Sequence, residues 1–522
     1  MLLAGCGSGN GSSASADAFA VKAGPETQVQ TTAGTYEGFW DAGIYTFRGI
    51  SYARSERFMP PQDPEHFDGV RMAKLYGPKA PQGENLRWNE AAGQTDYSFG
   101  NQFVMEPMDE QHCQVLNVWT PGLDDAKRPV FVWIHGGGFS SGSGHDLPCY
   151  EGRALAEYGD IVVVNLNHRL NALGYLDLSG LGGKYAESVN LGMQDIVKAL
   201  EWVKKNISKF GGDPSRVTIA GQSGGGGKVT ALLAMPSAKG LFSGAVIQSG
   251  SAFHFSDPAL SQKFGLDFVK EVGEDKLATA SYDELIAAER RASVRFAKES
   301  GMKQGRGAFI EGPVVDGKII TSQPFETAAP EESKDVPLLI GSNFNEFSFN
   351  VDSSLSEEKV LEMLTQRYGE EKAAAYAEAF KKDYPEMGAY NMVYMDDLFR
   401  PGAIQQASLK SQQGGAPAYV YLFNWRPQSN VLGASHGMEL PFMFHNVALQ
   451  REMTGASADA VKLQDTVADA WISFIKTGKP SAAGLPEWPA YDDADAPTMV
   501  IDNVSAVHNH LDDDIQKVLH AE

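Results

Sequence analysis

The amino-acid sequence predicts an α/β fold in which helices cover both faces of a large, mostly parallel sheet. Apolar runs at 130–134, 161–166 and 216–220 alternate with segments of helical periodicity, and this alternation is typical of parallel sheets. Two of these runs end in glycine-rich turns, which is where α/β sheets carry their functional groups.

In the first half of the chain, residues 35–50 read as a small antiparallel hairpin, and 115–119 as a buried strand before a turn. Strands follow at 130–134 and 161–166. Residues 188–210 predict a helix, because apolar side chains recur there with a period near 3.6. A Gly-Gly-Asp-Pro sequence then ends that helix.

The second half continues the pattern with strands at 216–220, 244–248, 336–340 and 418–423 and a helix at 224–235. Residues 258–306 and 355–410 are charged and mostly helical. We interpret these two blocks as excursions that cover the carboxyl edge of the sheet and hence the active site. Residues 21–522 then form one domain, preceded by a flexible segment at 1–20.

Composition limits the function. Of 522 residues, 43% are hydrophobic, and the formal charge of −22 is spread along the chain. Such a field repels phosphate backbones, so it argues against nucleic-acid partners. No run of eighteen apolar residues predicts a membrane-spanning helix.

Cys6 suggests a lipid anchor. Three cysteines are too few for a disulfide framework, and the sequence Leu-Leu-Ala-Gly before Cys6 is similar to a bacterial lipoprotein cleavage site. The Gly/Ser-rich segment that follows would be a tether. A signal peptide begins with a basic region and a longer apolar run, so we expect the natural sequence to start further upstream. The alternative is a frayed terminus with a chance cysteine.

Ser223 is the candidate nucleophile. It lies in a G-x-S-x-G sequence directly after one strand and before a helix, the context in which a serine sits exposed on a sharp turn. A floppy glycine loop is the plainer alternative. A phosphate-binding loop ending in Lys228 is excluded, because that motif needs Gly where Gln222 stands and Ser or Thr where Val229 stands.

The candidate oxyanion hole is formed by the N–H groups of Gly137, Gly138 and Gly224. The strand at 130–134 runs into His-Gly-Gly-Gly, a signature of lipases and esterases. An acyl-transfer intermediate carries a negative oxygen that needs such preorganised donors, and glycine permits close approach. A plain glycine turn is the alternative.

The residues alone leave the base and the acid open. His436 follows the strand at 418–423, at the end of the strand where catalytic groups gather, and His445 is its rival. Glu346 follows the strand at 336–340 and could orient an imidazole. Asp316 is the second candidate acid, although a turn residue is its simpler interpretation.

At this point the chain resembles the type-B carboxylesterases, the family that includes the cholinesterases. The resemblance spans nearly the whole sequence. It rests on 47–50, 116–118, 135–139, 199–203, 210–214, the Ser223 turn, 248–250, Glu346, His436-Gly437 and 439–442. It implies an α/β-hydrolase fold and a Ser223–Glu346–His436 triad, which selects His436 and Glu346 over their rivals. It implies ester hydrolysis through an acyl-enzyme, with no metal or organic cofactor. A catalytically silent binding protein is the alternative.

Three departures from that family pattern bear on function. Gln222 stands where the family usually has Glu, which favours neutral ester substrates over cationic ones. Ala80 takes the place of a cysteine that usually pairs with the one at Cys113, so we expect no disulfide there, and Cys149 reads as a small buried residue. Gly224 replaces a commoner alanine while keeping its N–H donor. Aromatic side chains near the site could line an apolar pocket: Phe139, Phe253, Phe309, Phe347, Phe349, Phe399, Trp425 and Trp88.

Overall fold

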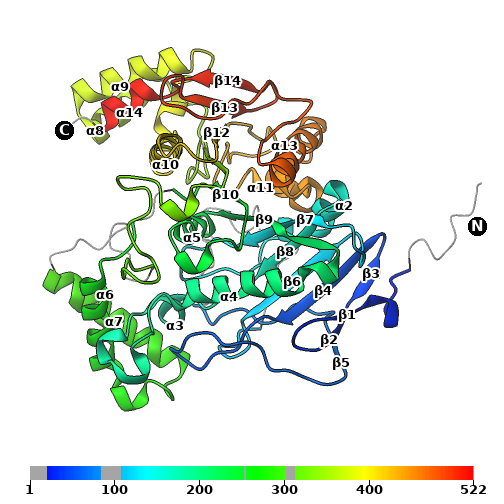
Figure 1. The fold of residues 1–522 in the computed structure, drawn as a ribbon. Helices are drawn as coiled ribbons and strands as arrows, with labels where there is room; N and C mark the ends of the chain where they lie inside the picture. The colour runs from blue at the N-terminus through cyan, green and yellow to red at the C-terminus, as the bar shows by residue number, and fades with distance from the viewer. Residues whose placement is uncertain (1–19, 84–106, 252–253, 301–311, 521–522) are drawn as a thin grey trace, which may run out of the picture.

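A computed structural model describes residues 20–83, 107–251, 254–300 and 312–520 of the chain. Its main sheet has eleven strands in the order β14-β13-β12-β11-β10-β9-β7-β8-β6-β4-β3 (Figure 1). The strands are β3 (Phe39–Asp41), β4 (Ile44–Ser51), β6 (Val115–Thr120), β7 (Arg128–Ile134), β8 (Val162–Leu166), β9 (Gly212–Gln222), β10 (Gly244–Gln248), β11 (Leu338–Asn343), β12 (Ala418–Phe423), β13 (Pro497–Ile501) and β14 (Ala506–Asn509).

The centre of this sheet is parallel, as predicted. Strands β8, β7, β9, β10, β11, β12 and β13 pair in parallel, whereas β3, β4, β6 and β14 are antiparallel to their neighbours. Parallel alignment places the carboxyl ends of β9, β11 and β12 at one edge of the sheet. Ser223, Glu346 and His436 all follow these strand ends.

Side chains of alternate residues divide between two cores, one on each face. In β7, Val130, Val132 and Ile134 face one core, and Phe131 and Trp133 face the other, as the two-residue period of a strand requires. The first core also contains residues of α4 (Leu191–Asn206), α5 (Gly224–Leu232) and α10 (Arg400–Gln412). The second contains residues of α2 (Arg153–Gly159), α11 (Leu440–Met443) and α13 (Ala458–Thr477).

The two charged helical blocks are inserted between strands of the main sheet. The first comprises α6 (Pro258–Val272) and α7 (Tyr282–Ser300), which share a separate apolar cluster with α3 (Asn171–Tyr175). The second comprises α8 (Glu357–Tyr368) and α9 (Glu370–Asp383), and the C-terminal helix α14 (Asp513–His520) packs on α9. Figure 1 shows both blocks on the left side of the sheet, one at each end. None of the helices in the described ranges combines the length and apolarity that a bilayer crossing needs.

The predicted hairpin at 35–50 is only partly correct. Strands β3 and β4 form it, but Thr35–Glu37 is a separate strand, β2, in a three-stranded sheet with β1 (Gln28–Gln30) and β5 (Val70–Met72). The chain changes sheets at Gly38, where a side chain would lie 2.3 Å from the carbonyl oxygen of Thr46. Only glycine permits this close approach, and Gly38 lies between the end of β2 and the start of β3.

Several other boundaries differ from the prediction: the helix expected at 188–210 is α4, and the one expected at 224–235 is the shorter α5. Strands β1, β5, β13 and β14 were not predicted. Strand β9 begins at Gly212, before the expected start at 216, and β11 begins at Leu338 because Val336 donates to the Ser333 carbonyl in a turn. Strands β13 and β14 are short and lie at the edge of the sheet, so their sequence carries little periodic signal.

Candidate active site

Ser223 occupies a strained turn between β9 and α5. Its backbone angles are φ 58° and ψ −127°, a region that residues with a side chain rarely adopt. The glycines around it permit the turn, since a methyl group at Gly221 would lie 2.4 Å from the carbonyl carbon of Gly225. The sharp turn lifts the serine out of the strand, as the motif predicts.

The glycine loop after β7 lies directly against this turn. Gly137 and Gly138 have φ values of +79° and +62°, and a methyl group at Gly224 would lie 2.2 Å from the Gly138 carbonyl oxygen. Among the described residues, the N–H groups of Gly137, Gly138 and Gly224 have no protein acceptor. The three predicted oxyanion donors are therefore free to bind a ligand oxygen.

His436 and Glu346 meet although they are far apart in the chain. His436 Nδ1 lies 2.5 Å from Glu346 Oε2, and the His436 N–H donates to the Glu346 carbonyl at 2.7 Å. Both side chains are nearly fully buried. A carboxylate facing Nδ1 places the proton on that nitrogen and the lone pair on Nε2, the tautomer that a general base requires.

The other carboxyl oxygen of Glu346 is held by two donors. Ser249 Oγ donates to Oε1 at 2.6 Å, and the Asn343 N–H donates at 2.7 Å. Burial raises the pKa of Glu346, and these two hydrogen bonds act in the opposite direction. Because Oε1 is occupied, Oε2 is left to face the imidazole.

Gln222 contacts the nitrogen of His436 that faces away from Glu346. Its Nε2 lies 3.0 Å from His436 Nε2, and because Nδ1 carries the proton, the amide is the donor. Two glycines lie beside this side chain. A methyl group added at Gly136 would be 3.5 Å from Oε1, and one added at Gly437 would be 3.8 Å from Nε2. In this structure the candidate base is therefore engaged by the residue that precedes Ser223.

A second buried carboxyl group lies nearby. Glu439 accepts from Gln248 Nε2 at 3.1 Å and from Asn343 Nδ2 at 2.5 Å. Burial raises its pKa to about 7, and the charge of Glu346 acts in the same direction. Glu439 binds amides, whereas Glu346 binds the imidazole.

The rival residues occupy structural positions. His445 pairs with Asp465 at 2.9 Å and stacks on Tyr158 with 4.0 Å between ring centroids. Asp316 Oδ1 accepts from the N–H groups of Lys318, Ile319 and Ile320, which is the turn role that its sequence context favours.

Some of the predicted aromatic residues surround the base. Phe347 and Phe399 stack on the His436 ring with centroid distances of 4.5 and 5.4 Å, and Phe349 packs on Phe347 at 6.2 Å. Phe347 is 39% exposed, so part of this aromatic side chain beside His436 is accessible.

Two further aromatic candidates, Trp425 and Phe139, are buried. Trp425 is buried against Phe442 and belongs to the core. Phe139 is buried against Tyr175. Phe253, Phe309 and Trp88, like Cys6, lie outside the described residues.

The two described cysteines agree with the sequence analysis. Cys113 and Cys149 are both free and buried, and burial raises the pKa of each thiol. Ala80 is also buried. Cys113 and Ala80 belong to the same apolar core cluster.

Sequence analysis did not identify Ser249 or the Gln222 contact. A signal for Ser249 was present, because it follows β10, and β10 pairs in parallel with β11, the strand that precedes Glu346. A polar residue at that strand end is placed next to the acid. No local pattern signals the Gln222 contact, which joins residues 214 positions apart.

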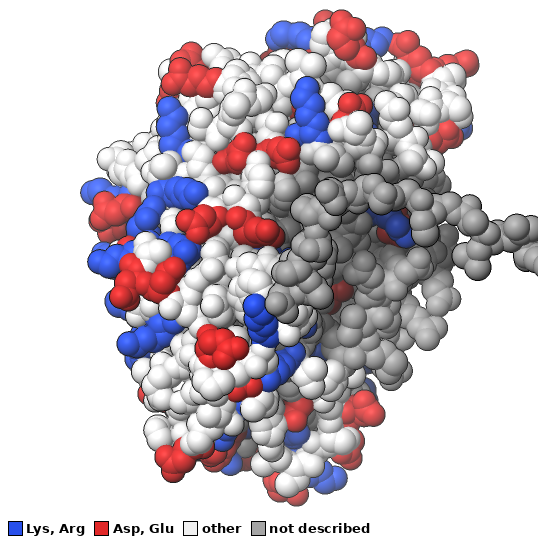
Figure 2. Space-filling view, turned by 90° about the vertical axis from the view of Figure 1, so that its right-hand side faces the viewer, with Lys and Arg blue, Asp and Glu red and all other residues white. Residues whose placement is uncertain are grey.

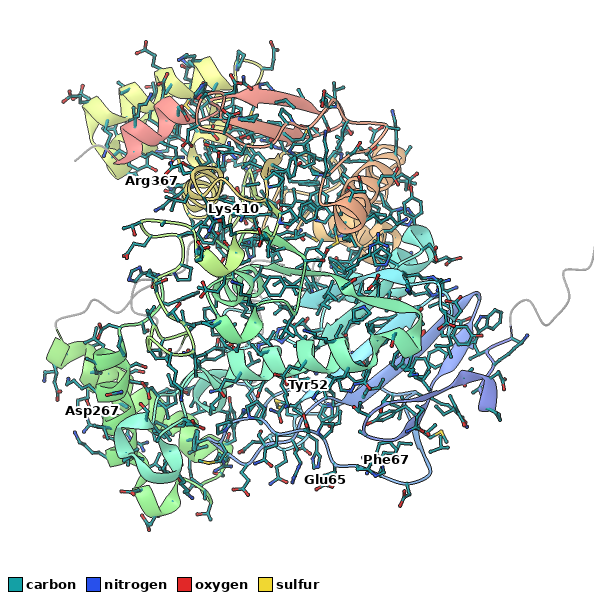
Figure 3. All side chains as sticks on the ribbon, in the orientation of Figure 1. Tyr52, Glu65, Phe67, Asp267, Arg367 and Lys410 are labelled. Atoms are coloured by element: carbon teal, nitrogen blue, oxygen red, sulfur yellow. The ribbon has the colours of Figure 1, made fainter. Side chains whose placement is uncertain are left out.

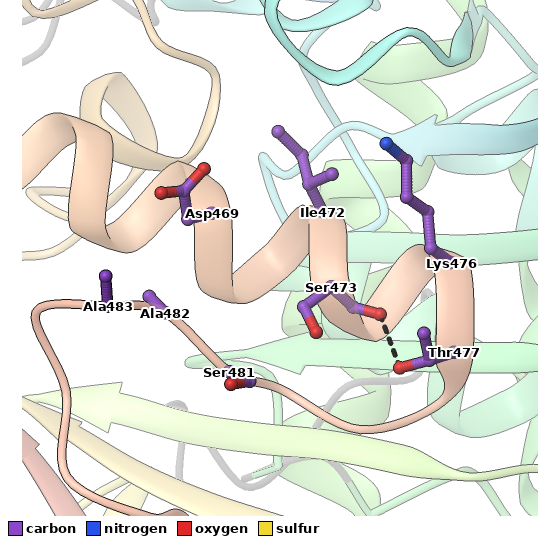
Figure 4. A pocket seen from close by; sticks show the side chains of 8 residues that line it. All are labelled: Asp469, Ile472, Ser473, Lys476, Thr477, Ser481, Ala482 and Ala483. Atoms are coloured by element: carbon purple, nitrogen blue, oxygen red, sulfur yellow. Dashed lines mark hydrogen bonds between the residues drawn. The ribbon is translucent and has the colours of Figure 1, made fainter.

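Two surface hollows lie away from these residues. One of about 420 Å³ lies between α13 and the segment after it, where Asp469, Ser473, Lys476 and Ser481 are among the lining residues (Figure 4). The other, of about 1070 Å³, is bordered by Arg54, Arg57, Glu110 and Lys184 among others. In the described part of the chain no cluster of three or more His, Cys, Asp or Glu side chains is arranged to hold a metal ion. Figure 2 shows acidic and basic side chains interspersed on one face.

A strained serine, a buried carboxyl–imidazole pair and a free glycine loop at one edge of this sheet define a serine hydrolase of the α/β-hydrolase fold. Residues 25–517 match the model of the carboxylesterase family, and the chain belongs to that family. It is an esterase that hydrolyses carboxylic esters.

Individual relatives can be aligned with this chain over nearly their full length. The chain is 35% identical to para-nitrobenzyl esterase of Bacillus subtilis (92% of this chain, 96% of the relative). It is 32% identical to phenmedipham hydrolase of Pseudarthrobacter oxydans (91% and 95%). A solved esterase of Clostridium hathewayi, described as hydrolysing aliphatic aromatic polyesters, superposes with a TM-score of 0.86 at 34% identity (96% and 99%).

Proposed function

We propose that Ser223, His436 and Glu346 form the catalytic triad of this esterase. The observation that carries the proposal is the 2.5 Å contact between His436 Nδ1 and Glu346 Oε2, beside a serine held at positive φ. The Glu346 carboxylate fixes the imidazole tautomer and stabilises the imidazolium that forms during the reaction.

The reaction proceeds in two acyl-transfer steps. His436 Nε2 takes the Ser223 proton as Oγ attacks the ester carbonyl, and the resulting oxyanion accepts from Gly137, Gly138 and Gly224. The intermediate collapses as His436 protonates the leaving alcohol. Water, deprotonated by His436, then attacks the acyl-enzyme, and Ser223 regains its proton when the acid leaves.

A panel of p-nitrophenyl esters from acetyl to octanoyl tests this function. We expect turnover of several members, with a chain-length optimum that measures the acyl site. A folded protein that hydrolyses none of them would favour the alternative, a catalytically silent binding protein on the hydrolase scaffold.

Gln222 must release His436 before the base can accept the serine proton. Replacing Gln222 with Glu exchanges an amide donor, which favours neutral imidazole, for a carboxylate, which favours imidazolium. We expect the acid limb of the kcat/KM–pH profile of Gln222→Glu to move to higher pH by about one unit. Gln222→Met, which removes the hydrogen bond without adding charge, is the control. An unchanged profile in Gln222→Glu would show that the amide does not influence the base.

We propose that the substrates are neutral esters with an aromatic or medium-length apolar group. Gln222 carries no charge to attract a cation, and Phe347 is a partly exposed aromatic side chain next to His436. His436 protonates the leaving alcohol, so Phe347 would border the alcohol side of the ester. The names of two relatives, para-nitrobenzyl esterase and the polyester-hydrolysing esterase, fit such substrates.

Hydrolysis of acetylcholine and of its uncharged isostere 3,3-dimethylbutyl acetate compares a cationic with a neutral ester of the same shape. We expect kcat/KM to be higher for the neutral ester by about tenfold, since the site offers no compensating carboxylate at position 222. Phe347→Ala should raise KM for benzyl acetate more than for ethyl acetate. A clear preference for acetylcholine would contradict the proposed substrate class.

We also propose that Cys6 is lipidated and anchors the protein at the bacterial cell envelope, with the Gly/Ser-rich segment that follows it as the tether. A secreted or periplasmic protein without an anchor is the alternative. The support is the cleavage-site sequence before Cys6. Expression of the chain behind a lipoprotein signal peptide, followed by detergent phase partition, tests this. Wild type should enter the detergent phase and Cys6→Ser should remain in the aqueous phase. Equal partition of both would reject the anchor.

A further inference from the structure

A lysine is buried on the helix that begins at the nucleophile. Lys228 lies on α5 and has no exposed surface, whereas lysine is almost never fully buried unless it is paired. Within the described residues it forms no ion pair. Its Nζ donates to the carbonyl oxygen of His135 at 3.0 Å and lies 5.7 Å from the ring centroid of Phe139.

These two partners are the ends of the glycine loop that carries the oxyanion donors. His135 precedes Gly136 and Phe139 follows Gly138. Gly224 and Lys228 are four positions apart and therefore share one face of α5. Gly224 lies against Gly138, and Lys228 holds His135, so one helix face contacts the loop at both ends.

Lys228 carries the positive charge in a buried cluster that it forms with His135 and His168. The rings of His135 and His168 lie 4.7 Å apart, and burial and the charge of Lys228 lower the pKa of both, which keeps them neutral. His145 and Lys79 also act on His135 in that direction. Burial lowers the pKa of Lys228 to about 7, and the charge of Asp146 opposes this shift. The ammonium is thus present below about pH 7 and lost above it.

We propose that Lys228 is a positioning residue of the oxyanion hole, which fixes the His135 carbonyl and places a buried positive charge behind the Gly136–Gly138 loop. This inference rests on the proposed triad mechanism. The charge of the oxyanion develops only in the transition state, so a fixed positive charge behind its donors raises kcat with little effect on KM. Neutral Lys228 can still donate to His135, so deprotonation removes the charge and keeps the hydrogen bond.

Lys228→Met tests the proposal, because methionine keeps an unbranched apolar side chain and removes the amine. We expect kcat for p-nitrophenyl butyrate at pH 6.5 to fall about tenfold or more with KM nearly unchanged. The wild-type kcat–pH profile should also decline between about pH 7 and 9, and that decline should be absent from Lys228→Met.

Lys410 provides a matched control. It is buried on α10 (Figure 3), it donates to the carbonyl oxygens of Ser333 and Lys334 and to Gln413 Oε1, and burial lowers its pKa to about 8. Lys410→Met removes a buried amine that does not touch the glycine loop. It should therefore retain the wild-type kcat and the wild-type decline of kcat between about pH 7 and 9.

Thermal unfolding measures the titration of Lys228 directly. The unfolded chain binds this proton up to about pH 10.5, and the folded chain only up to about pH 7. Between these values the unfolded state holds more protons, so wild-type stability rises with pH through this window. The gain in Tm from Lys228→Met should be largest below pH 7 and shrink toward pH 10.

Two results would overturn the proposal. One is a folded Lys228→Met variant that keeps the wild-type kcat, or in which kcat still declines between about pH 7 and 9. The other, which needs no variant, is a wild-type kcat that stays constant from pH 7 to 9. Either result leaves the triad intact as long as activity still requires Ser223, so the two proposals fail separately.

Discussion

Ser223→Ala should lower kcat by about 10⁴- to 10⁶-fold, because the oxyanion donors and the substrate site remain while the nucleophile is gone. KM should change little, since Oγ forms its bond only during the reaction. The measurement is hydrolysis of p-nitrophenyl butyrate, with circular dichroism to verify folding. The substitution should relieve little of the backbone strain at φ 58°, because alanine also has a Cβ atom.

Mass spectrometry after reaction with a fluorophosphonate provides the control for this prediction. Wild type should carry one adduct on the peptide that contains Ser223, and Ser223→Ala should carry none. Ser249→Ala is a useful comparison, because Ser249 is a nearby serine whose hydroxyl binds Glu346. An adduct on any other serine, together with retained activity in Ser223→Ala, would reject the assigned nucleophile.

Glu346→Gln should lower kcat by about 10⁴-fold with the fold intact. Ser249 Oγ and the Asn343 N–H both donate to Oε1, so the glutamine would place its oxygen there and turn its NH₂ toward His436 Nδ1. The imidazole would then carry its proton on Nε2, where it cannot accept from Ser223.

Asp316→Asn is the matched control, since Asp316 was the rival acid in the sequence and serves a turn in the structure. It should keep wild-type kcat. Thermal unfolding of both variants separates loss of activity from loss of structure. A large loss in Asp316→Asn with normal activity in Glu346→Gln would reverse the assignment of the acid.

The sequence motifs predicted the two parts of the site whose geometry depends on adjacent residues, the Ser223 turn and the glycine loop. A strand, a G-x-S-x-G turn and a helix place Ser223, and a strand followed by three glycines places the oxyanion loop. Both follow from the conformational freedom of glycine at neighbouring positions. The parallel sheet was predicted for a similar reason, because its buried strands and amphipathic helices carry their periods within short windows.

The sequence alone left the base and the acid open. His436 and His445 both follow the same strand, and only the family resemblance selected between them. The structure separates them by their partners, Glu346 for one and Asp465 for the other. The Ser249–Glu346 and Gln222–His436 contacts join residues 97 and 214 positions apart. The position of Ser249 after a strand was its only signal in the sequence, and the Gln222 contact had none.

The sequence by itself determined the fold class, the family, the nucleophile turn and the glycine loop of this protein. Only the tertiary structure showed that Gln222 contacts His436, that Ser249 donates to Glu346 and that Lys228 is buried behind the Gly136–Gly138 loop. The reason is physical: glycine turns and strand periods are properties of adjacent residues, whereas burial and hydrogen bonding at the site depend on which strand ends the sheet brings together.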